Sequence, residues 1–214
     1  MGDPLADRIE SRPVVGSEVV HHGMVWDVVR ERVDLGGDAG EVTREFVDHP
    51  GAVAIVALDE QDRLVLVQQY RHPVRAFLWE VPAGLLDVDG EDPWRAAARE
   101  LHEEADLVAQ QWHVLVDYFT SPGGMNEALR VYLARGLSQV PDAHRHEREG
   151  EELGMPVRWV GLDDALAAVL AGRVHNTSAV VGILAAHAAR AQGWATLRPH
   201  DAPWPAHPAH RTDA

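Results

Sequence analysis

The sequence predicts an α+β protein, arranged as an α/β/α sandwich around a mixed β-sheet. Three observations lead to this class. The run GAVAIVAL at residues 51–58 is almost wholly apolar, as expected of a central strand. A helix with a strong start signal, Asp92-Pro93, follows several strand-like runs. Two more helical segments, 162–171 and 176–191, come late in the chain, so strands precede and follow one central helix.

The N-terminal part, residues 1–48, is expected to form an antiparallel β ribbon. Its strand-like runs alternate in polarity, and the glycine-rich stretch GGDAG at 36–40 suits a hairpin loop. The ribbon has little core of its own, so we expect it to pack on a neighbour or on a second subunit. Two of its side chains stand out: Arg44, and Trp26, which suits either apolar packing or stacking on a base.

The rest of the chain divides into a main domain at 49–192 and a tail at 193–214. The tail is rich in Pro, His and Ala, and we expect it to be loose. The segment 141–154, PDAHRHEREGEELG, is long, charged and unpatterned, which is typical of a functional or disordered loop. Beyond the central strand, further strands are expected at 63–70, 78–82, 112–120, 129–134 and 155–160.

Composition narrows the function classes. The 214 residues suffice for one sizeable domain with a small appendage. Cysteine is absent, which excludes disulfides and thiol nucleophiles. The formal net charge is −15, which argues against nucleic acid or an anionic membrane as a partner. With no apolar run long enough for a membrane span and no secretory signal, we expect a cytoplasmic protein.

The helix that begins at Pro93 carries three carboxylates on nearly one face. Glu100, Glu103 and Glu104 stand at i, i+3 and i+4. An anonymous group of this kind is usually a solvated acidic face. It is also the donor set that a hard divalent cation takes, because such ions prefer carboxylate oxygens. The longer frame favours the second interpretation, since a strand-like run, a glycine turn and an acidic loop lead into the capped helix.

This unit resembles the Nudix box, G-x5-E-x7-R-E-U-x-E-E-x-G-U, where U is a bulky aliphatic residue. The matching residues are Gly84, Glu91, Arg99, Glu100, Leu101, Glu103, Glu104 and Leu107. Two departures exist. Six residues instead of five separate Gly84 from Glu91, and the last glycine of the box is Asp106 here. The extra residue falls in a loop, where insertions are tolerated, and Asp can adopt the left-handed conformation that glycine often supplies.

The resemblance implies a Nudix sandwich with a catalytic domain at 49–192, and a metal-dependent hydrolase of nucleoside diphosphates linked to a second group. It implies Mg²⁺ or Mn²⁺, two or more ions per site. Glu100 and Glu104 would be the main ligands and Glu103 a secondary one, with an oxygen from the backbone carbonyl of Ala83. Arg99 would hold the carboxylates, and Glu91 would orient that network.

Beyond the box, the chain resembles the ADP-ribose pyrophosphatase branch of the family, through Gln68-Gln69-Tyr70-Arg71, Glu80-Val81-Pro82-Ala83-Gly84 and Ser121-Pro122-Gly123-Gly124. The branch implies a homodimer that exchanges its N-terminal ribbons. It also implies hydrolysis of ADP-ribose to AMP and ribose 5-phosphate. The alternatives are another nucleoside diphosphate sugar, such as GDP-mannose, and a non-catalytic regulator that binds ADP-ribose.

In that branch, side chains outside the box bind the substrate and activate the water. Arg71 would bind a phosphate and Glu127 would lie at the substrate. Arg44 would reach the partner subunit's site, and Trp26 is the candidate for base stacking. The general base would be a glutamate on the 141–154 loop. Its position before the strand at 155–160 favours Glu151 or Glu152, and the sequence does not separate these two.

Overall fold

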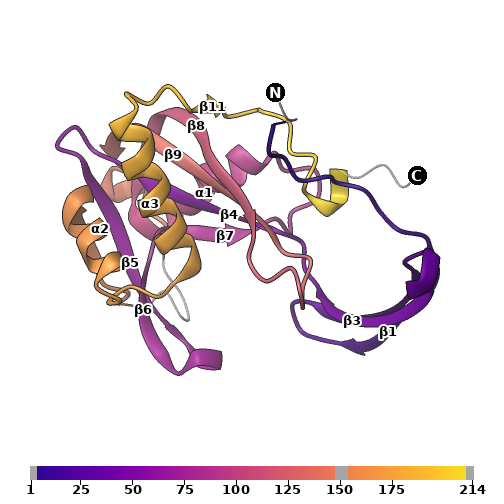
Figure 1. The fold of residues 1–214 in the computed structure, drawn as a ribbon. Helices are drawn as coiled ribbons and strands as arrows, with labels where there is room; N and C mark the ends of the chain where they lie inside the picture. Colours follow the sequence, from indigo (N-terminus) through magenta and orange to yellow (C-terminus); the bar gives the residue numbers. More distant parts are fainter. Residues whose placement is uncertain (1–3, 148–153, 211–214) are drawn as a thin grey trace. The chain divides into compact units, whose positions relative to one another are not determined.

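The computed structural model describes residues 4–147 and 154–210 (Figure 1). Their contacts divide the chain into two compact units, which are described separately. The ribbon unit comprises the described parts of residues 1–51, 119–128 and 203–214. The sandwich unit comprises the described parts of residues 52–118 and 129–202. The prediction of three sequential parts, at 1–48, 49–192 and 193–214, stays a prediction.

The sandwich unit holds two sheets and three α-helices. A mixed sheet has the strand order β11-β8-β9-β4-β7, in which β4 and β9 run parallel, and a smaller antiparallel sheet has the order β10-β5-β6. The elements are β4 (Ala52–Ala57), β5 (Arg63–Arg71), η2 (His72–Val74), β6 (Ala76–Glu80), β7 (Ala83–Leu85), α1 (Pro93–Ala105), β8 (Leu107–Phe119), β9 (Ala128–Gln139), η3 (Asp142–His144), β10 (Val157–Gly161), α2 (Leu162–Leu170), α3 (Thr177–Ala191) and β11 (Arg198–Pro199).

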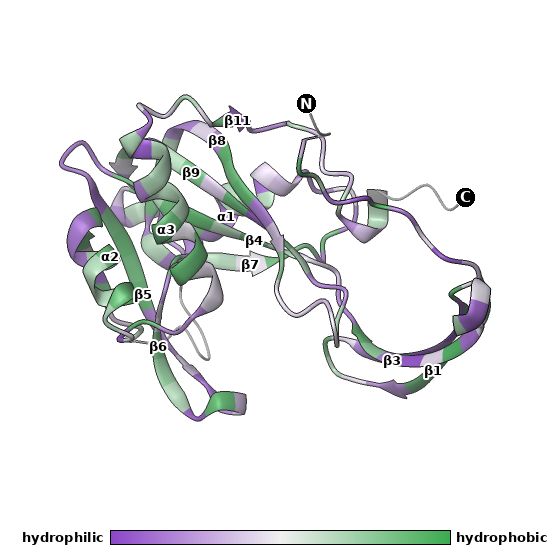
Figure 2. Cartoon of the chain, in the orientation of Figure 1, coloured by the Kyte–Doolittle hydropathy of each residue, from purple (hydrophilic) through white to green (hydrophobic). Residues whose placement is uncertain are grey.

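Strand β4 lies at the centre because both of its faces are covered. All six of its residues are buried. Ala54 and Val56 pack with residues of α2 and α3, whereas Val53 and Ile55 pack with residues of α1. Figure 2 shows β4 and β5 as mainly apolar strands. Helices on opposite faces of a mixed sheet confirm the predicted α/β/α sandwich.

Helix α1 has the boundaries that its sequence signals predict. Asp92 is the N-cap residue and Pro93 the first helical residue, although the Asp92 side chain accepts a bond from Arg95 (3.2 Å) and caps no backbone N–H. Asp106 ends the helix in the left-handed conformation (φ 54°, ψ 38°), as expected of the residue that replaces the box glycine. The helix therefore ends in a conformation that glycine favours, although no glycine is present at this position.

The ribbon unit contains the predicted antiparallel ribbon, β1 (Val14–His22), β2 (Asp27–Asp34) and β3 (Glu41–Asp48), with η1 (Gly37–Ala39) in the loop between β2 and β3. Part of the C-terminal tail also belongs to this unit. It includes η5 (Pro208–His210) and two nearly buried side chains, Trp204 and His207. His207 contacts the carbonyl oxygen of Pro50 through Nε2 at 3.1 Å. Across residues 4–147 and 154–210, no helix is both long and apolar enough to cross a bilayer.

Candidate active site

Arg99 gathers the acidic residues of the box around one guanidinium group. It donates to Glu91 through Nε (3.3 Å) and Nη2 (3.1 Å), and to Glu100 (2.6 Å) and Glu103 (3.2 Å) through Nη1. The hydrogen bonds that Arg99 donates to Glu91 and the negative charges of its neighbours raise the pKa of Arg99. The guanidinium thus stays charged and holds three carboxylates that would otherwise repel one another.

Gly84 allows the Glu100 carboxylate to lie directly against the backbone of β7. A Cβ atom at position 84 would stand 2.0 Å from Oε1 of Glu100, far closer than any real contact. The need for glycine here is therefore spatial, since no other residue leaves room for the carboxylate. This contact explains why glycine stands at position 84 of this chain.

Glu104 lies deeper than its acidic neighbours and makes different contacts. The residue is 6% exposed, and its carboxylate accepts bonds from the backbone N–H of Ala83 (3.0 Å) and from the Gln69 side chain (3.1 Å). A buried carboxylate needs such donors because desolvation of its charge is costly. Glu104 therefore joins α1 to β5 and to β7 at the glycine turn.

The donor set of this site fits hard divalent cations. It is made of carboxylate oxygens, and the Glu100 carboxylate lies directly against the backbone at Gly84. Among residues 4–147 and 154–210, no three His, Asp or Glu side chains are already arranged around one point as metal ligands. The contacts account for this, because Arg99 holds Glu100 and Glu103 while Glu104 faces Ala83 and Gln69.

Arg71 is held by a residue that the sequence interpretation did not select. It is the last residue of β5 and forms a bidentate ion pair with Glu80 of β6. The donor-to-acceptor distances are 2.9 Å from Nε and 2.7 Å from Nη2. The Glu80 side chain is 4% exposed, whereas the Arg71 side chain is 44% exposed. A buried carboxylate thus orients a guanidinium that stays accessible. Glu80 begins the stretch Glu80-Val81-Pro82-Ala83-Gly84. An acidic residue at the end of an apolar strand, close to Gly84, was the sequence signal that could have identified it.

His49 brings two of the predicted substrate residues together within the ribbon unit. Its ring stacks on Trp26 (centroids 5.4 Å apart, planes at 29°), and its Nε2 lies 3.5 Å from Oε1 of Glu127. Its Nδ1 accepts a bond from the Gly51 N–H (3.0 Å), so the neutral ring carries its proton on Nε2, toward Glu127. Glu127 also accepts a bond from the Thr120 hydroxyl. Burial lowers the pKa of His49, which favours this neutral form.

The sequence interpretation missed His49, because nothing in its local pattern separates it from the other histidines. The Trp26 ring that it supports is 44% exposed and lies between β1 and β2. Arg44 is exposed on β3 and donates to the carbonyl oxygen of Thr43 (2.9 Å). Glu151 and Glu152, the candidates for the general base, lie outside the described residues.

The chain is similar in sequence and in fold to proteins that are already known. A NUDIX domain model matches residues 48–179. An ADP-ribose pyrophosphatase of Mycobacterium tuberculosis is 47% identical over 192 residues, which cover 89% of each chain. A methanol dehydrogenase activator of Bacillus methanolicus is 36% identical over 170 residues, 79% of this chain and 89% of that protein. The crystal structure of an ADP compounds hydrolase has a TM-score of 0.69, covers 88% of this chain and 99% of its own, and is 20% identical. This last likeness concerns the fold.

Proposed function

This chain belongs to the Nudix family, and we propose that it hydrolyses the diphosphate of ADP-ribose to AMP and ribose 5-phosphate. The relative that is 47% identical carries the name ADP-ribose pyrophosphatase, and the match covers most of both chains. The observation that carries the proposal is the acidic face of α1, whose Glu100 and Glu104 lie against the Ala83-Gly84 backbone. Cleavage of a diphosphate needs positive charge beside the phosphate oxygens. These carboxylates are suited to hold divalent metal ions that supply this charge.

Nudix hydrolases use divalent metal ions, and for this chain we propose two or more Mg²⁺ or Mn²⁺ ions. Glu100 and Glu104 would be the main ligands, with Glu103 and the carbonyl oxygen of Ala83 as further donors. When bound, the ions supply charge neutralisation of the diphosphate oxygens and a lowered pKa for a bound water. Arg99 keeps the carboxylates on one side of α1 through its bonds to Glu91, Glu100 and Glu103.

The hydrolysis needs a base and substrate contacts besides the acidic face. A water oxygen attacks one phosphorus, the bond from that phosphorus to the bridging oxygen breaks, and a base accepts the proton of the water. We propose Glu151 or Glu152 as that base. Arg71, aligned by Glu80, is suited to bind a phosphate of the substrate through its accessible guanidinium. Glu127 is proposed at the substrate, and Trp26, supported by the His49 ring, is proposed as a stacking surface.

We further propose a homodimer formed through the ribbon. Its first strand and the turn after it expose apolar side chains that a lone ribbon leaves in water: Val14, Val15, Val19, Val20, Met24 and Val25. Arg44 would then reach the partner's site. Arg44→Ala should raise KM for ADP-ribose in steady-state kinetics, and an unaltered KM would limit the ribbon to dimerisation. A cytoplasmic location stays a prediction.

Product analysis tests the reaction directly. The full chain is incubated with ADP-ribose or GDP-mannose and with Mg²⁺, Mn²⁺ or EDTA, and the products are separated by ion-exchange chromatography. We expect AMP and ribose 5-phosphate, a preference for ADP-ribose, and no turnover in EDTA. Equal rates with both sugars would reject the substrate assignment. Binding of ADP-ribose without turnover would favour the alternative of a non-catalytic regulator. One relative of this chain carries the name methanol dehydrogenase activator.

A further inference from the structure

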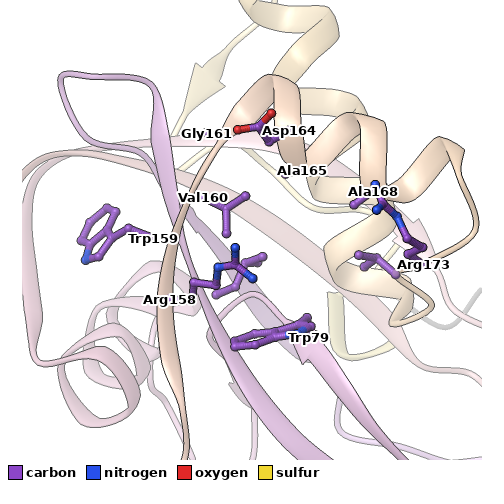
Figure 3. A pocket seen from close by; sticks show the side chains of 11 residues that line it. Trp79, Arg158, Trp159, Val160, Gly161, Asp164, Ala165, Ala168 and Arg173 are labelled. Atoms are coloured by element: carbon purple, nitrogen blue, oxygen red, sulfur yellow. The ribbon is translucent and has the colours of Figure 1, made fainter.

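The sandwich unit contains a cavity of about 450 Å³ between the sheet β10-β5-β6 and helix α2. Its walls come from Leu66 of β5, Trp79 of β6, residues 158–161 at β10, the first turns of α2 and the connection to α3. In Figure 3 the Trp79 ring and the Arg158 side chain lie beside each other on one wall, and Arg173 comes from the opposite side. This volume is within the range of small-molecule pockets.

The cavity lies on the sheet face that is turned away from α1. Strand register decides this. Trp79 pairs with Gln68, and Arg158 pairs with Leu66, so all four side chains lie on one face of the sheet. Glu80 and Gln69 alternate with them and lie on the other face, where Gln69 bonds Glu104 of α1. The cavity and the acidic face are therefore two sites, on opposite sides of β5 and β6.

Two guanidinium groups line this cavity without a partner in the part of the chain that the structure describes. The side chains of Arg158 and Arg173 are exposed, and neither guanidinium group forms an ion pair or hydrogen bond there. Most other arginines in the sandwich unit are paired, such as Arg63 with Asp59 and Arg130 with Asp117. In a chain of net charge −15, acidic partners are plentiful, so two unpaired guanidiniums at one cavity form a local site for an anion.

We propose that this cavity binds a nucleoside monophosphate. The phosphate takes the guanidiniums of Arg158 and Arg173, because a guanidinium donates two parallel bonds to phosphate oxygens. The base packs on the exposed side of the Trp79 ring, which is half-buried in the same wall. Asp164 lines the cavity from the first turn of α2 and is an acceptor for a ribose hydroxyl.

Isothermal titration calorimetry of the full chain in EDTA, with AMP as the probe, tests this proposal. We expect saturable binding that weakens at least about 10-fold in Arg158→Gln/Arg173→Gln, since each charged hydrogen bond to phosphate is strong. Arg8→Gln/Arg12→Gln removes the same charge from a segment that does not line the cavity, and it should bind AMP as the natural chain does. Trp79→Leu should weaken binding by about 10-fold through lost stacking.

Two further titrations separate the contribution of the phosphate to the affinity from that of the nucleoside. Inorganic phosphate and adenosine should each bind at least about 10-fold more weakly than AMP, because each keeps only one half of the contacts. The proposal is overturned by equal AMP binding in the double variant, by equal binding of inorganic phosphate, or by absence of saturable binding up to about 1 mM.

Discussion

Glu104 on the box helix accepts a hydrogen bond from the backbone N–H of Ala83, 21 residues earlier in the chain, at 3.0 Å. This bond ties the acidic face of α1 to the strand that begins at the glycine turn. It also places a buried carboxylate beside the space that Gly84 leaves for Glu100. The arrangement of α1 against β7 is thus stabilised by the same side chains that are proposed to hold the metal ions.

Glu104→Gln keeps the shape of this side chain but removes its charge. We expect kcat for ADP-ribose to fall by at least about 100-fold. Loss of a residue that only supports a metal ligand costs up to about 100-fold, and Glu104 is proposed as a ligand itself. The concentration of Mg²⁺ or Mn²⁺ needed for half-maximal rate should rise as well. Steady-state kinetics over a metal titration measures both. Glu60→Gln, in the exposed turn after β4, removes the same charge as a control, and equal rates in the two variants would contradict the assignment.

Gly84→Ala adds one methyl group where the structure has no room. The new Cβ would lie 2.0 Å from Oε1 of Glu100, so the carboxylate or the strand must move. We expect a strong loss of kcat together with a loss of stability of about 1–3 kcal/mol, as for overpacking in a core. Urea unfolding and initial rates test this. At Gly123 a Cβ atom would meet nothing within 4 Å, so Gly123→Ala should keep its stability.

Arg71→Gln removes the cation that Glu80 orients. If Arg71 binds a substrate phosphate, KM for ADP-ribose should rise by about 10-fold or more, because charged hydrogen bonds are the strong ones. Glu80→Gln keeps Arg71 in the chain but weakens its alignment, so its KM should rise less. A Glu80→Gln variant whose KM rises as far as that of Arg71→Gln would show that alignment matters as much as the charge itself. An unchanged KM in Arg71→Gln would reject the phosphate contact.

The buried His49 should make stability depend on pH. Burial lowers its folded-state pKa below the ordinary value of 6.5, so the unfolded chain binds the proton more readily. The free energy of unfolding should therefore fall as the pH drops below 6.5, through the interval down to the folded pKa. Urea unfolding at about pH 7.5 and about pH 5.5 measures the change.

His49→Gln should show a smaller loss over the same interval, because it removes the group that titrates differently in the two states. His21→Gln, at an exposed histidine on β1, should behave as the natural chain does. If the His49→Gln and natural profiles run parallel, the proposed cause of the pH dependence is wrong. The Trp26 ring that His49 supports gives a second measurement, since its fluorescence should change with the protonation of its neighbour.

Local patterns predicted the elements of the main domain well. The predicted helix start at Asp92-Pro93 matches that of α1, and the predicted helix at 176–191 matches α3 within a residue, because capping and apolar periodicity depend on near neighbours. Strand ends were less accurate. Strand β8 begins at Leu107, five residues before the predicted run at 112–120, because pairing with a neighbouring strand extends it. The predicted strand at 78–82 overlaps only the end of β6, which stops at Glu80, and a separate strand in another sheet, β7, begins at Ala83.

The local patterns could not predict which residues contact one another in the folded chain. Glu104 bonds Gln69 across 35 residues, and Trp26 meets Glu127 only through His49, which stands near neither in the sequence. The cavity at Trp79 and Arg158 depends on strand register, since a shift by one residue would turn Arg158 to the other face. Such contacts are set by how strands pair and helices pack.

The sequence by itself determined the carboxylate face of α1 and its ends, because i, i+3 and i+4 spacing and capping follow from helix geometry alone. It also determined that β4 is central, since a wholly apolar strand must be covered on both faces. Only the tertiary structure decided that Glu80 orients Arg71, that Gly84 makes room for Glu100, and that two arginines line a cavity behind the box. Those relations join residues on different strands, helices and loops, and packing, not local geometry, brings them together.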